Sequence, residues 1–245
     1  MSLVLDNADD YAVTTTPPVT ATPLTIAAWV NPNSVGTLDG IVHIGDAALG
    51  TVTQCFLLRM DASGQVNFYA ADTAGNSAIT TNTTATMTAS AWNHAVGIST
   101  SAASRRSVLN GNWAESGTNT TGRTPTGVTD LTLGVFPNGG SPSNEWNGYI
   151  AHVAVWDIAL SQAEVEALAG GANPLTIQNA NLVAYWPMTN SGAVGEDVIG
   201  ANTLTLSGNT AYSSENPTVD AAGSPLILPH RSSGGMIDLS GNFRG

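Results

Sequence analysis

The sequence contains no lysine, little charge of either sign and a single cysteine. Its six basic residues are all arginines, and against 18 acidic residues they leave a formal net charge of −12. Binding of nucleic acid requires a basic face that neutralises phosphates, and an acidic membrane surface repels a chain of this charge. We therefore expect no nucleic acid and no membrane among its partners.

The lone cysteine, Cys55, excludes an intrachain disulfide and a metal site built from several thiolates. It lies in the run QCFLLRM, which reads as a strand, so we expect a buried thiol. No apolar run approaches the roughly 18 residues of a membrane span. No signal peptide is visible before the first expected strand, so we expect either that the protein is not exported by the general route or that a leader has been removed. Because charged residues are few, neutral Thr, Ser, Asn and Gly must form most of the water-exposed surface. Such a surface is typical of an extracellular or particle-exposed β-protein.

The chain is rich in short segments of strand character that are separated by Gly, Pro, Asn and Asp. We expect strands at 24–31, 40–45, 54–60, 65–70, 92–100, 130–135, 149–156, 182–186 and 203–207, and a tight hairpin at 107–115 around Asn110-Gly111. Units of βαβ type would need a helix between most strands. The close spacing of short strands and turns therefore predicts an all-β fold, an antiparallel two-sheet sandwich that forms one domain over residues 1–215.

The segment 149–156 shows the strand pattern most clearly, because its residues alternate in character. A period of two places Tyr149, Ala151, Val153 and Val155 on one face and Ile150, His152, Ala154 and Trp156 on the other.

A short helix is expected directly after this strand. Ser161, followed three residues later by Glu164, forms a capping box. The spacing predicts a helix over Gln162–Ala169 that buries Val165 and Leu168 and ends at the following glycine. Apart from this one short α-helix the chain shows almost no helical pattern.

Several motifs in this order resemble laminin G-like, or concanavalin A-like, jelly-roll domains. They are LDNADDYAV at 5–13, TIAAWVNP at 25–32, AWNHAVGI at 91–98, LNGN at 109–112, LTLGV at 131–135 and the strand-to-helix stretch at 146–170. Residues 181–207 are similar to a strand pair that often lies at one end of such domains. The resemblance implies a jelly-roll sandwich, and stand-alone proteins of this kind and size recur among the structural proteins of tailed bacteriophages.

The last thirty residues, 216–245, differ from the rest, because they are rich in Pro, Gly and Ser with few apolar side chains. We expect an extended C-terminal arm that cannot build its own core. Either it lies across its own sandwich or it docks on a neighbouring subunit. In the second case its anchoring residues would be Arg231, Met236, Ile237, Leu239, Phe243 and Arg244.

No catalytic constellation is visible in the sequence. Glycoside hydrolysis needs two carboxylates at a defined separation, and the Glu-x-Asp-x-x-Glu run of the hydrolases in the resembling family does not occur here. Glu164 and Glu166 fall on the expected helix, where residues two apart diverge. His94 and His152 fall within strands, which favours hydrogen-bonded structural histidines over catalytic ones.

Calcium is the cofactor that the resemblance implies, and Asp6, Asp9 and Asp10 are the weak candidates for its ligands. Aspartates in such a turn also hydrogen-bond to backbone amides, and we favour this interpretation. We therefore expect no cofactor.

These observations lead to two hypotheses on function. The first is a non-enzymatic virion structural protein, a capsid decoration or head-fibre protein on the virion surface that contacts capsid subunits and forms a homo-oligomer. The alternative is a carbohydrate-binding, lectin-like adhesion module with an extracellular or cell-surface location. Glycans would then stack on an exposed aromatic ring, for which Trp113 and Trp146 are the best placed unless both are core or strand-edge tryptophans.

Overall fold

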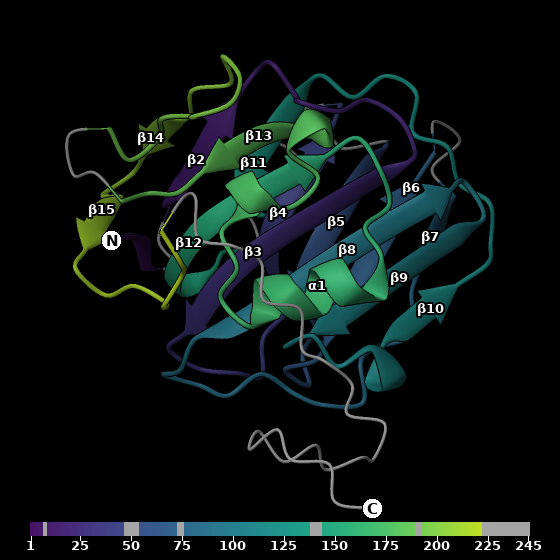
Figure 1. The fold of residues 1–245 in the computed structure, drawn as a ribbon, viewed down its shortest axis with the longest axis horizontal. Helices are drawn as coiled ribbons and strands as arrows, with labels where there is room; N and C mark the ends of the chain where they lie inside the picture. The colour runs from purple at the N-terminus through teal and green to yellow at the C-terminus, as the bar shows by residue number, and fades with distance from the viewer. Residues whose placement is uncertain (7–8, 47–53, 73–75, 138–143, 190–192, 222–245) are drawn as a thin grey trace, which may run out of the picture.

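The computed structural model describes residues 1–6, 9–46, 54–72, 76–137, 144–189 and 193–221, and it forms two antiparallel sheets packed face to face (Figure 1). Sheet A contains eight strands and sheet B contains seven. This confirms the predicted all-β sandwich. No helix in the described part of the chain is long and apolar enough to cross a membrane.

Sheet A has its longest strands in the middle. In spatial order it contains β10 (Gly117–Asn119), β9 (Ser104–Leu109), β8 (Asn93–Ser101), β3 (Leu24–Pro32), β12 (Asn147–Trp156), β1 (Ser2–Asp6) and β15 (Ala211–Ser213), with β13 (Leu182–Trp186) also paired to β12. Two strands share one edge of β12, because β1 pairs with its first half and β13 with its second half.

Sheet B lies behind sheet A in Figure 1. In spatial order it contains β14 (Thr205–Ser207), β2 (Tyr11–Thr14), β11 (Asp130–Leu133), β4 (Asp39–Gly45), β5 (Cys55–Met60), β6 (Val66–Ala71) and β7 (Ser77–Ile79). Every pairing in both sheets is antiparallel.

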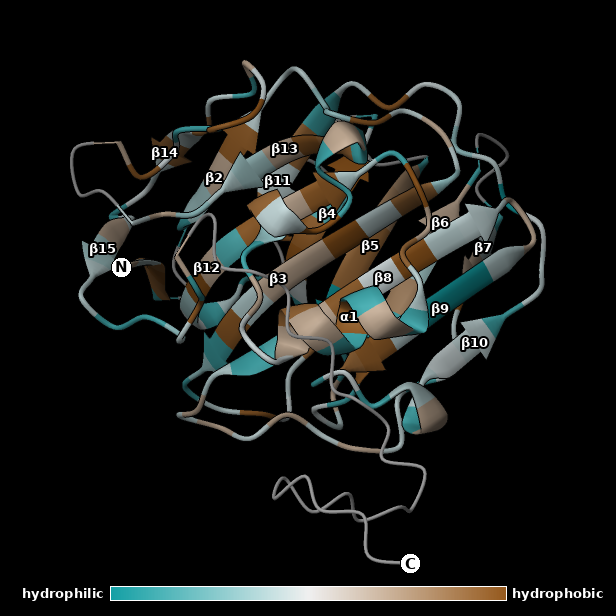
Figure 2. Ribbon diagram, viewed as in Figure 1, coloured by the Kyte–Doolittle hydropathy of each residue, from teal (hydrophilic) through white to brown (hydrophobic). Residues whose placement is uncertain are grey.

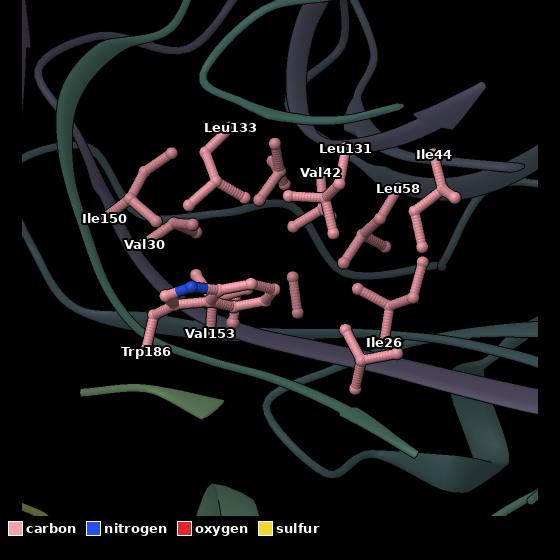
Figure 3. Packing of buried hydrophobic residues seen from close by; sticks show 14 of the residues in the cluster. Ile26, Val30, Val42, Ile44, Leu58, Leu131, Leu133, Ile150, Val153 and Trp186 are labelled. Carbon is pink, nitrogen blue, oxygen red and sulfur yellow. The ribbon is translucent and has the colours of Figure 1, made fainter. Parts of the chain in front are cut away.

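The main core fills the space between the two sheets. Figure 3 shows Ile26, Val30, Ile150, Val153 and Trp186 of sheet A facing Val42, Ile44, Leu58, Leu131 and Leu133 of sheet B. All ten side chains are fully buried. In Figure 2 the apolar colour is concentrated on the central strands, whereas the connecting loops are mostly pale or polar. Burial of apolar surface at roughly 25 cal/mol per Å² is the main force that holds the sheets together.

Helix α1 (Gln162–Ala169) lies on the outer face of sheet A, in front of β8 in Figure 1. The backbone N–H of Ser161 donates to Glu164 Oε2 at 2.7 Å, and the reciprocal contact completes the predicted capping box. Val165 and Leu168 are buried, in a second cluster that also contains Trp156 and Val96 of sheet A. The predicted helix is confirmed in its bounds, its cap and its buried face.

Two local predictions need correction. The alternation of the 149–156 strand is interrupted by a β-bulge between Ala151 and Ala154, so that Ile150 before it and Val153 after it both face the main core. The Asn110-Gly111 pair has the expected positive φ angles of 50° and 71°. It is not a two-residue hairpin turn, however, because the 3₁₀ helix η1 (Trp113–Glu115) separates β9 from β10.

Three-residue 3₁₀ helices also occur between α1 and β13, namely η2 (Pro174–Thr176) and η3 (Asn179–Asn181). The described chain continues after β15 to Ala221, where the Asp220 N–H donates to the Gly171 carbonyl at 2.7 Å. The first six residues of the predicted C-terminal arm therefore lie against their own sandwich. Residues 222–245 are outside the described part, and so are the six predicted anchoring residues from Arg231 to Arg244.

Candidate functional site

The outer face of sheet B carries a row of polar and aromatic side chains on β5 and β6. Alternation along these strands turns Leu58 and Phe68 into the main core, so that Arg59 and Tyr69 point to the opposite face. The Arg59 guanidinium carbon lies 5.4 Å from the centre of the Tyr69 ring. Phe136 approaches the same tyrosine with its ring centre at 6.3 Å and tilted by 57°.

Amide side chains hold this arrangement in place. Arg59 Nε donates to Asn67 Oδ1 at 2.7 Å, and Asn67 Nδ2 donates to Asn82 Oδ1 at 3.1 Å. Asn82 Nδ2 in turn donates to Gln65 Oε1 at 3.2 Å and to Asp61 Oδ2. We call the set Arg59, Asn67, Tyr69, Asn82 and Phe136 the outer-face row.

The electrostatics of the outer-face row favour an oxygen-rich ligand. Burial lowers the pKa of the Arg59 guanidinium, and the nearby Tyr69 and Asp61 oppose this effect. The side chain remains a cation, since an arginine in a protein does not lose its proton near neutral pH. Its two terminal nitrogens donate to no described residue, so they are available to the hydroxyl or carboxylate oxygens of a ligand.

A second feature is an open groove of about 820 Å³ at the edge of the sandwich, between β14 and β15. Leu206 pairs with Ala12, and Tyr212 pairs with Leu3, so both side chains point toward the space between the sheets. The sandwich does not close over them, and Leu206 is 38% and Tyr212 51% exposed. Glu196 and two threonines add polar groups to the lining.

The two predicted aromatic platforms lie in different environments. Trp146 is fully buried in the main core, so it cannot stack on a glycan, and this part of the site prediction is wrong. The backbone N–H of Trp146 donates to the Gly134 carbonyl at 2.8 Å, which brings the chain inward there. Trp113 is half-buried on η1, where the Arg106 guanidinium covers its ring at 4.3 Å from the centre.

The aspartates proposed for calcium form a hydrogen-bonded turn. Asp10 Oδ2 accepts the N–H of Asp6 at 3.1 Å, and the N–H of Asp9 donates to Glu145 Oε1 at 3.2 Å. In the described part of the chain, no three acidic, histidine or cysteine side chains converge in a way that would hold a metal ion. Hydrogen bonds to backbone N–H groups thus hold the described part of this turn, as the preferred interpretation of the aspartates expects.

Structural contacts occupy the two candidate carboxylates of α1 and also a further carboxylate, Asp197. Glu164 caps α1, and Glu166 accepts a hydrogen bond from Gln162 at 2.6 Å. Asp197 is buried and accepts the N–H groups of Tyr185, Ile199 and Asn202. These contacts fix turns and a strand end, and none of them places two carboxylates across a cleft.

A comparison with known protein families identifies the family to which this chain belongs. Residues 6–166 match the family profile described as the concanavalin A-like lectin/glucanases superfamily. The match covers well over half of the chain, so the protein belongs to this family. No curated protein matches the chain in sequence.

Solved structures share the fold at low sequence identity. A heptameric SAP-like pentraxin from Limulus polyphemus superposes with a TM-score of 0.56 and 13% identity, over 84% of this chain and 94% of its own. The carbohydrate-binding module CBM40 of a Ruminococcus gnavus sialidase, bound to α2,3-sialyllactose, gives 0.53 and 20%, over 62% and 84%. Domain 4 of the arabinanase AbnA from Geobacillus stearothermophilus, in complex with arabinotriose, gives 0.55 and 17%, over 69% and 76%.

Proposed function

We propose that this protein is a non-catalytic carbohydrate-binding module and that the outer-face row is its glycan site. The observation that carries the proposal is the Arg59 guanidinium, which is held over the Tyr69 ring by Asn67 while its two terminal nitrogens have no described partner. Recognition of sugars combines aromatic and apolar surface with a few fixed polar groups. The outer-face row supplies both kinds of group within a few ångströms.

The similar solved structures agree with carbohydrate binding as a function of this fold. Two of the similar structures contain a bound oligosaccharide, sialyllactose in one and arabinotriose in the other. Those ligands belong to those proteins, and identities of 20% and 17% support a shared fold alone. The outer-face row must therefore carry the argument for this chain, and the identity of its glycan is an experimental question.

A glycan array followed by calorimetry with the best-bound glycan tests the proposal. We expect Arg59→Ala to weaken binding by about tenfold or more, since a hydrogen bond to a charged group contributes about 1.5–3 kcal/mol. Tyr69→Ala should also weaken binding, because it removes the aromatic surface of the site and the ring beneath the guanidinium. Tyr11→Ala is the matched control, because Tyr11 is a half-buried tyrosine on β2 of the same sheet. Its affinity should equal that of the wild type.

Two further variants locate the site if the outer-face row is not responsible. Full affinity in both Arg59→Ala and Tyr69→Ala would overturn the assignment. Loss of binding in Tyr212→Ala would then place the glycan in the edge groove, and loss in Trp113→Ala would place it at η1. Melting temperatures of all variants show whether a lost affinity reflects a lost fold.

A further inference from the structure

A pocket of about 360 Å³ lies on the outer face of sheet A, and the outer-face row has no part in it. Its floor is formed by His152 of β12 and Tyr185 of β13. Its cover is the last described segment, Asn216–Ala221. Two hydrogen bonds hold this cover down: the Asp220 N–H donates to the Gly171 carbonyl at 2.7 Å, and Asn173 Nδ2 donates to the Asp220 carbonyl at 2.9 Å.

The bulge in β12 is what directs His152 toward this pocket. His152 has a φ of 48°, a left-handed conformation that is uncommon for a residue other than glycine and that costs conformational energy. The bulge lies between Ala151 and Ala154, and bulges of this kind re-aim a side chain out of the regular alternation. A strained backbone at a pocket is a reason to look for a ligand there.

The imidazole of His152 is buried, and only one of its two ring nitrogens forms a hydrogen bond with the described residues. The side chain is 6% exposed, and its Nδ1 lies 2.6 Å from the Tyr185 hydroxyl. Its Nε2 forms no hydrogen bond of ordinary geometry with the described residues, although the Asn216 side chain lies close enough to interact with the ring. A buried polar atom without a partner costs free energy, so the pocket contains an unused recognition group. Burial lowers the pKa of His152 to about 4, while the neighbouring Asn216 side chain acts in the opposite direction, and the imidazole is neutral at pH 7.

We infer that this pocket, called here the His152 pocket, binds one neutral, hydroxyl-rich ring of the size of a monosaccharide. Depending on the tautomer of His152, Nε2 is either a donor or an acceptor. A hydroxyl group both donates and accepts, so it can pair with Nε2 in either tautomer. A carboxylate would face a neutral imidazole in a pocket whose described lining contains no lysine or arginine; the amino group of Met1 acts on the imidazole but does not line the pocket. The volume lies within the usual range of small-ligand pockets, and the Thr189 side chain adds a further hydrogen-bonding group.

Access to Nε2 depends on the cover. Asn216 is exposed and its side chain lies next to the imidazole, so this side chain must turn away when a ligand reaches Nε2. Val198 lines the pocket and is 44% exposed. A large side chain at position 198 would therefore fill the pocket without disturbing the core of the sandwich.

Side-chain NMR of ¹⁵N-labelled full-length protein tests the inference, with glucose, galactose and mannose added one at a time. The Nε2 resonance of His152 should shift in a saturable way with at least one of them. The expected dissociation constant is on the order of 1 mM, the strength of a ring with about twelve non-hydrogen atoms at ordinary ligand efficiency. Asn216→Ala should leave this binding unchanged or tighten it.

Val198→Trp should abolish the saturable shift while the spectrum of the folded protein is retained, and His152→Gln should weaken binding at least fivefold as measured by calorimetry. Tyr69→Ala, which removes the aromatic ring of the outer-face row, should leave the shift of His152 intact. The two proposals can thus fail separately. A wild-type protein whose Nε2 resonance does not respond to any of the three sugars, or binding that survives both Val198→Trp and His152→Gln, would overturn the inference.

Discussion

Acidification from pH 7.5 to pH 5.5 should destabilise this protein, because three of its histidines are buried in the neutral state. His43 and His94 are fully enclosed, and burial lowers the pKa of each to about 3. Burial lowers the pKa of His152 to about 4. Among the described residues, His43 Nε2 and His94 Nδ1 have no hydrogen-bond partner. The nearby carboxylate of Asp46 partly opposes the effect of burial on His43, whereas His94 is affected by burial alone.

The sign of the effect follows from proton linkage. A histidine takes up its proton near pH 6.5 in the unfolded chain and several pH units lower in the folded protein, so the unfolded state binds more protons as the pH falls. Between pH 7.5 and 5.5 each of the three histidines should therefore reduce the free energy of unfolding by about 1.4 kcal/mol, or about 4 kcal/mol together. This is a large fraction of the 5–15 kcal/mol that is usual for a domain.

Urea denaturation at pH 7.5, 6.5 and 5.5 measures the change directly. The series stops at pH 5.5, because burial raises the pKa of Asp39 and its protonation at lower pH would work in the opposite direction. His94→Gln should remove about one third of the pH dependence, since its ring packs against Trp29 at 5.0 Å without a charged partner. An unfolding free energy that stays within about 1 kcal/mol over this range would refute the reasoning.

Three substitutions and one control substitution test the packing and the turns by urea or thermal denaturation. Gly148→Ala should reduce the free energy of unfolding by about 3 kcal/mol or more. Gly148 has a φ of 140°, and a Cβ there would lie 2.1 Å from a backbone carbonyl oxygen of β3. Gly122→Ala is the control and should leave the stability unchanged, because the space around Gly122 is open. Asp197→Ala should cost about 2–4 kcal/mol by leaving buried N–H groups without an acceptor, and a loss below 1 kcal/mol would contradict this role. Ser161→Ala should cost about 1 kcal/mol through the lost N-cap, with far-ultraviolet circular dichroism nearly unchanged.

Features set by neighbouring residues were predictable from the sequence. The helix at Gln162–Ala169 depends on a capping box and a buried stripe that lie within one short segment. The order of the strands along the chain follows from turn residues and alternation, and most of them form where expected. The family resemblance over the same motifs agrees with the match at residues 6–166.

Features set by long-range contacts were not predictable. Trp146 follows a loop rich in Gly and Pro, which suggests exposure, yet pairing of its backbone with Gly134 brings the ring into the core. The bulge at His152 leaves no signal in a run that alternates well. Arg59 and Tyr69 meet only because β5 and β6 pair in one particular register. Alternation within each strand predicts only that each side chain points away from the core.

The virion location, the capsid partners and the homo-oligomer remain predictions from the sequence. The arm residues on which they depend lie outside the described part of the chain. Mass spectrometry of purified particles tests the location, and sedimentation of the full-length protein tests the oligomer.

The pairing of β1 with β15 has a topological consequence. Ser2 lies opposite Ser213 in the same sheet, so a short linker between these two positions would close the backbone into a ring at a small entropic cost. Reopening such a ring at the exposed residue Gly122 would give a circularly permuted protein with all of its strand partners preserved. Because Ser2 and Ser213 lie side by side at one edge, the sandwich can also be inserted into a loop of another protein through that edge. Its other surfaces then remain free.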